Sequence, residues 1–63
     1  MIYKVVVMGK REEVVGDFQC NEEIRVKDEV KIGPREFLVM KRRFYVVDGK
    51  AAKVDLLTSE LLF

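Results

Sequence analysis

The sequence predicts an all-β domain, either a small five-stranded barrel of the SH3-like type or a β-roll. Eleven of the 63 residues are valine and only two are alanine, and β-branched side chains favour strands over helix interiors. Short apolar runs alternate with polar, glycine- or proline-containing breaks, a pattern typical of short strands joined by turns. A chain of this length buries one small core, so we expect a single domain over residues 1–63.

The first two predicted strands, residues 2–8 and 13–20, form a hairpin around the polar residues 9–12. A four-residue loop sets an aromatic pair and an ion pair directly across the strands, and each pair contributes about 0.2–1 kcal/mol. In this register the opposed pairs are Tyr3–Phe18, Lys4–Asp17, Val5–Gly16, Val6–Val15 and Val7–Val14.

The third predicted strand spans residues 24–32 and ends before a turn at residues 33–36, because Pro34 cannot donate to a sheet ladder. Alternation along this strand directs four apolar side chains toward the core. They are Ile24, Val26, Val30 and Ile32.

The fourth predicted strand, residues 37–47, has a charged middle and no constant period, which indicates a strongly bent or bulged strand that serves two sheets. Asp48 and Gly49 then predict a tight hairpin turn into a fifth strand at residues 51–57. For residues 58–63 the sequence leaves two alternatives open, a short C-terminal helical turn and a last short strand.

The residue inventory argues against an enzyme and against a metal site. The chain has no histidine, so it lacks the usual proton carrier at neutral pH and the commonest nitrogen ligand for metals. Cys20 is the single cysteine, which permits neither an internal disulfide nor a cysteine ligand set and favours a reducing compartment. We therefore expect no catalytic residues, no metal, no cofactor and no small-molecule substrate.

Hydropathy indicates a soluble protein, and the single cysteine indicates that it is cytoplasmic. Twelve basic residues balance eleven acidic ones, and the net charge of +1 creates no field that would attract nucleic acid or a membrane. Every apolar run is far shorter than the roughly 20 residues of a membrane span. The abundance of glutamate, lysine and branched aliphatic residues resembles the composition of proteins from hyperthermophiles.

Apolar residues exceed what the interior of one small barrel can hold. Neighbouring valines at residues 5–7, 14–15 and 46–47 place apolar side chains on both faces of their strands. One explanation is that residues 61–63 cover an outer face. The other is an exposed patch that marks a protein partner or self-association, as such patches usually do. The side chains expected in this patch are Val6, Met8 and Val15.

A basic segment with adjoining aromatic residues is the second candidate site. Small barrels that bind single-stranded nucleic acid combine cationic grooves with rings on which bases stack. The residues that would serve this role are Lys41, Arg42, Arg43 and Tyr45. However, strand alternation sends Arg42 and Phe44 to one face and Arg43 to the other, and a solvated bend whose cations pair with acids such as Asp55 explains the same run.

These observations predict a non-enzymatic domain that acts in protein association, as a homo-oligomer or as an accessory subunit. The alternative is a small nucleic-acid-binding barrel that uses residues 41–45.

Overall fold

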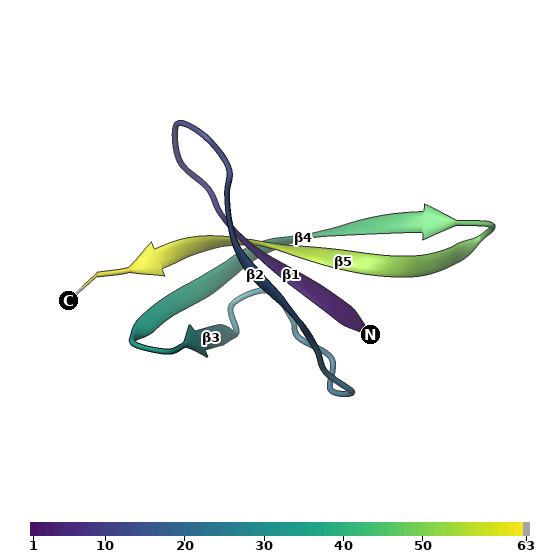
Figure 1. Cartoon of the computed structure of the whole chain (residues 1–63), viewed down its shortest axis with the longest axis horizontal. Coiled ribbons are helices and arrows are strands. Elements are labelled where there is room, and N and C mark those ends of the chain that lie inside the picture. The colour runs from purple at the N-terminus through teal and green to yellow at the C-terminus, as the bar shows by residue number, and fades with distance from the viewer. Residues whose placement is uncertain (63) are drawn as a thin grey trace.

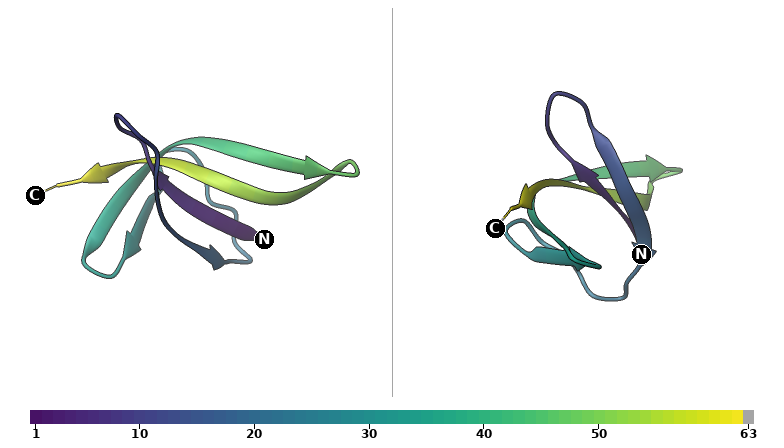
Figure 2. Two further views of the ribbon diagram at one scale, coloured as in Figure 1. Left: turned by 45° about the horizontal axis from the view of Figure 1, so that its top comes forward. Right: turned by 60° about the vertical axis from the view of Figure 1, so that its left-hand side comes forward.

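The computed structural model describes residues 1–62, and the chain is all-β, as predicted. Its strands are β1 (Ile2–Val7), β2 (Glu13–Gln19), β3 (Glu29–Ile32), β4 (Arg35–Val47) and β5 (Lys50–Leu61) (Figure 1). They form one sheet in the order β2-β1-β5-β4-β3. Successive strands alternate in direction, so the first and the fifth point the same way and pair in parallel. The sheet curls into a half-barrel, which the right-hand view of Figure 2 shows.

The β1–β2 hairpin has the predicted register over its first half only. Tyr3 faces Phe18, Lys4 faces Asp17 and Val5 faces Gly16, which confirms three of the expected pairs. Beyond them a β-bulge shifts the register by one residue, and the two remaining expected pairs are wrong. Val6 now faces Val14, and Val7 faces Glu13. A bulge of this kind inserts an extra residue into one strand and increases the local twist.

The third strand is shorter than predicted, because residues 24–28 form a loop and a turn in which Lys27 has a φ of 78°. As a result Val26 is exposed, which contradicts its expected inward direction, whereas Ile24 and the two apolar residues of β3 pack against the core. The turn into β4 contains only Gly33 and Pro34, since Ile32 already faces Arg35. Gly33 has a φ of 58°, which a residue without Cβ adopts readily.

The β4–β5 hairpin is the longest element and turns at Asp48 and Gly49, as predicted, with φ angles of 50° and 75°. The register shifts at Met40 in the middle of β4, which agrees with the expectation of a bulged strand. β5 continues to Leu61, so the C-terminal tail is a strand and the alternative of a helical turn is wrong. Phe63 lies outside the described residues.

The core lies on the inner side of the half-barrel. Its fully covered side chains come from the three central strands, whereas those of the edge strands, such as Phe18 and Val30, are only partly buried. The central members are Tyr3, Val5, Phe37, Val39, Val54 and Leu56. Thr58 is buried as well, and its hydroxyl donates a hydrogen bond to the Val6 carbonyl oxygen at 2.9 Å.

Beyond the core, β4 and β5 continue as a two-stranded ribbon that extends to the right of Figure 1. We call residues 44–53 of this ribbon the arm. β1 pairs with β5 only between Val54 and Thr58, and β3 pairs with β4 only as far as Leu38. Within residues 1–62, each strand of the arm therefore has only the other as a neighbour, and the molecule is elongated, at 41 × 26 × 18 Å.

Candidate functional site

The arm exposes four large apolar side chains in succession, residues 44–47. Val46 and Val47 are 65% and 59% exposed, the highest values for large apolar side chains within the described strands. The aromatic residues that precede them, Phe44 and Tyr45, are also exposed. β-branched and aromatic residues favour the extended conformation, so the segment forms a strand locally although no core covers it.

The two aromatic rings lie on opposite faces of the arm, because Phe44 faces the core residue Val54 across the ladder and Tyr45 faces Lys53. Each ring is flanked by cations. The Arg42 guanidinium lies 5.4 Å from the Phe44 centroid, and the Lys53 ammonium lies 5.0 Å from the Tyr45 centroid. Such cation–π contacts stabilise the base of the arm and leave the two valines near its tip uncovered.

A buried carboxylate anchors the arm to the sheet. Asp55 is 1% exposed, and its Oδ2 accepts hydrogen bonds from Arg43 at 2.9 Å and from the Tyr45 hydroxyl at 3.0 Å. Burial raises the pKa of the Asp55 carboxyl, but these two hydrogen bonds and the nearby Lys4 and Arg43 charges outweigh burial and leave the pKa below its ordinary value. Arg43 also binds both carboxylate oxygens of Glu12 at 3.3 Å, which ties the arm to the β1–β2 loop.

Two lysines lie close together beside this carboxylate. Lys4 faces Asp55 across the parallel β1–β5 ladder, and the pKa of Lys53 is lowered, first by the neighbouring Lys4 side chain and then by burial. The Asp55 Oδ1 and the Arg43 Nε are buried without a hydrogen-bond partner among the described residues. Opposite charges nearly balance in this cluster, so its chemistry is that of a structural anchor that fixes the direction of the arm.

The residues expected to form the association patch do not come together. Val6 is on the outer face but only 1% exposed, so its expected exposure is wrong. Val15 packs against the core, because the β-bulge turns it inward and leaves Val14 exposed on the outer face instead. Only Met8 is exposed as expected. Gly16 in the middle of the strand predicts a bend or bulge at this point, which the structure confirms next to it at Val15. The apolar pattern does not show which of the two neighbouring valines the bulge turns inward.

The basic segment divides between the two faces of the sheet, as the alternation predicts. Arg42 faces Leu56 on the inner side and donates to Glu23 at 3.1 Å, and the hydrogen bond from Arg42 lowers the pKa of that carboxyl. Arg43 lies on the outer side with Asp55, the acid that the sequence indicated as its partner. Lys41 is exposed beside them. Both arginines are thus engaged by carboxylates and do not form one cationic groove.

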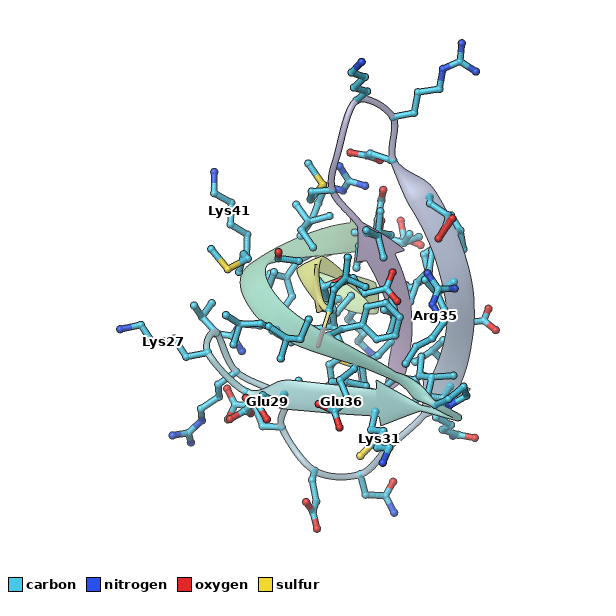
Figure 3. The ribbon with its side chains drawn as sticks, turned by 90° about the vertical axis from the view of Figure 1, so that its left-hand side faces the viewer. Lys27, Glu29, Lys31, Arg35, Glu36 and Lys41 are labelled. Carbon is cyan, nitrogen blue, oxygen red and sulfur yellow. The ribbon has the colours of Figure 1, made fainter. Side chains whose placement is uncertain are left out.

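The edge of the sheet at β3 is rich in charged side chains. Figure 3 shows Lys27, Glu29, Lys31 and Glu36 along this edge. Lys31 and Glu36 face each other across β3 and β4 and form an ion pair at 3.9 Å. Charges of this kind keep an edge strand from pairing with another chain. The edge at β3 therefore differs from the apolar arm.

An open cleft of about 340 Å³ lies at the end of the half-barrel next to the N-terminus. Tyr3 lines the cleft, and its hydroxyl makes two hydrogen bonds there. The hydroxyl donates to the Glu22 carbonyl oxygen and accepts from the Ile24 amide, each at 3.2 Å. Cys20 and Arg42 also line the cleft. These bonds hold the β2–β3 linker against β1, which gives the polar groups of the cleft a structural role.

Within residues 1–62, no group of histidine, cysteine, aspartate or glutamate side chains is arranged to hold a metal ion. The described part of the chain also contains no helix that is long and apolar enough to cross a membrane. The chain matches no protein family, no curated protein and no solved structure.

Proposed function

We propose that this chain is a non-enzymatic domain of the small SH3-like barrel type that acts in protein association, and that the arm is its contact surface. The observation that carries the proposal is the exposure of Val46 and Val47 on a ribbon without a core. By strand alternation Val46 lies on the face of Phe44 and Val47 on the face of Tyr45, so the arm exposes apolar side chains on both faces. Exposed apolar patches usually mark an interaction surface.

The energetics of the arm support this role. A two-stranded ribbon by itself is at best marginally stable in water, and strands become stable when further strands or an apolar layer join them. The Asp55 anchor and the cation–π contacts hold only the base of the arm. A protein partner that covers the tip would supply the missing layer.

Nucleic-acid binding is the weaker alternative. A binding groove needs several cations on one surface with accessible rings. Here Arg42 and Arg43 lie on opposite faces, and each is already paired with a carboxylate.

The single unpaired Cys20 supports a reducing, cytoplasmic environment as the place where the domain acts.

A photo-crosslinking residue at position 47 tests the proposal in the cells that make the protein. We expect p-benzoylphenylalanine in place of Val47 to form a covalent adduct with a protein on irradiation. The matched control replaces Lys10, which is exposed in the loop of the other hairpin, and should give no adduct. Equal adducts at both positions, or none at position 47, would contradict the proposal.

A further inference from the structure

We propose that the partner of the arm is a second copy of the same chain, and that the free edges of the two β4 strands pair antiparallel over residues 42–48. The two arms then form a four-stranded ribbon in the order β5-β4-β4-β5. This inference rests on the proposed function and specifies the partner.

The outer edge of β4 is available for such pairing. Along this edge β4 is paired with β3 as far as Leu38, and Val39 exchanges backbone hydrogen bonds with Lys27 and Asp28. From residue 43 to residue 47 this edge has no backbone partner within residues 1–62. Exposed backbone donors and acceptors on a strand edge are a template for another strand.

The β4 edge lacks the features that protect other edges. Between Phe44 and Val47 the strand has no charge, no proline and no bulged residue, and its four residues favour strands strongly. The β5 edge of the same arm differs, because it carries Lys50 and Lys53 and a register shift between them. Because the β5 edge is protected against pairing with another strand and the β4 edge is not, we expect the arm to pair through β4.

Charge complementarity favours a second copy in the antiparallel direction. The β4 part of the segment begins with Arg42 and Arg43 and is followed by the turn residue Asp48. Each arginine also binds a carboxylate of its own chain, but both guanidinium side chains stay partly exposed, at 28% and 39%. An antiparallel pair centred on Tyr45 places Arg42 opposite Asp48 of the second copy and Phe44 opposite Val46 of the second copy. A parallel pair would place like charges side by side, which is unfavourable.

The proposed contact has two-fold symmetry and therefore closes as a dimer without extending into a fibre. Because the paired segments are short, we expect a contact below the roughly 1,200 Å² that marks the lower limit of standard interfaces, and a dissociation constant in the micromolar range. The Asp55 anchor contributes by fixing the direction of the arm before the two copies meet.

Disulfide trapping tests this arrangement in a Cys20→Ser background. Residues directly opposite in an antiparallel pair have Cα atoms about 4.5–5.5 Å apart, within the range that a disulfide spans. We expect Tyr45→Cys to form a disulfide-linked dimer on mild oxidation. Lys53→Cys is the matched control, because it lies on the same face of the arm but in β5, three strand spacings from its copy, and should remain monomeric.

Tyr45 also binds Asp55, so a mixture of Phe44→Cys and Val46→Cys chains provides a second test that leaves this hydrogen bond intact. We expect a mixed disulfide dimer in preference to either homodimer. Preferential trapping of Lys53→Cys, or wild-type chains that stay monomeric at millimolar concentration in sedimentation, would overturn the pairing. If position 47 then crosslinks to a different protein, the proposed function stands and only the identity of the partner is wrong.

Discussion

Arg43 and Asp55 face each other across the β4–β5 ladder, with the guanidinium Nη2 2.9 Å from the carboxylate Oδ2. The carboxylate is fully buried, whereas the guanidinium reaches the surface and binds Glu12 of the neighbouring hairpin. This one arginine therefore joins β5 and the β1–β2 loop at the point where the arm leaves the sheet.

Replacing Arg43 with methionine should destabilise the fold strongly. The substitution leaves the Asp55 charge buried with only the Tyr45 hydroxyl as a donor, and removing one partner of a buried ion pair costs about 3–5 kcal/mol. We expect a loss of about 3 kcal/mol in the free energy of unfolding, measured by urea titration. Arg25→Met, which removes an exposed ion pair, is the control and should cost under about 0.5 kcal/mol. Equal losses in the two variants would refute the anchoring role.

Stability should fall in acid, and Asp55 should contribute to the fall. The pKa of this carboxyl is lowered in the folded state, so the unfolded chain takes up a proton first as the pH decreases. Its contribution is complete above about pH 5 and is lost as the pH falls through the folded-state pKa. The pKa of Glu60 is also lowered, by its hydrogen bond with Arg35, so protonation of Glu60 also reduces stability in acid.

The contribution of Asp55 is obtained by comparing wild type with Asp55→Asn in urea titrations between pH 7 and pH 2. The difference in the free energy of unfolding should be largest near neutrality and should shrink at low pH. A difference that stays constant over this range would contradict the lowered pKa.

Gly49→Ala should loosen the arm without unfolding the sheet. Gly49 has a φ of 75°, where an alanine is strained by about 1 kcal/mol. Because the arm has no core contacts, we expect amide hydrogen exchange in residues 44–53 to accelerate about fivefold while β1 exchanges as before. Gly16→Ala is a suitable control, since a Cβ there meets no atom within 4 Å. Uniform acceleration across all strands would show that the arm opens only with the whole domain.

Oligonucleotide binding should be weak and should not follow the dependence on salt that a groove of three cations requires. Three phosphate contacts to a single strand give a log–log slope of about −2. The arginines of this segment point apart and are paired, so we expect at most millimolar affinity at low salt. Micromolar binding with that slope, abolished by Arg42→Glu with Arg43→Glu, would favour the nucleic-acid alternative.

Local patterns in the sequence determined the all-β class, the turn at Asp48 and Gly49, the division of Arg42 from Arg43 and the pairing of Tyr3 with Phe18. These features depend on side-chain alternation and turn chemistry within a few residues, which a sequence displays directly. The partner of Arg43 could also be indicated, because Asp55 lies in the adjacent strand of the same hairpin.

The tertiary structure alone decided which valines are exposed and which strand edges are free. The bulge that turns Val15 inward lies opposite the part of β1 that also pairs with β5, from the other end of the chain, and it increases the local twist of the curled sheet. The arm exists because β1 and β3 end before β4 and β5 do. The sequence shows an apolar surplus at Val46 and Val47, but strand lengths relative to distant neighbours are a property of the assembled sheet, so the sequence did not show that this surplus lies on a free edge.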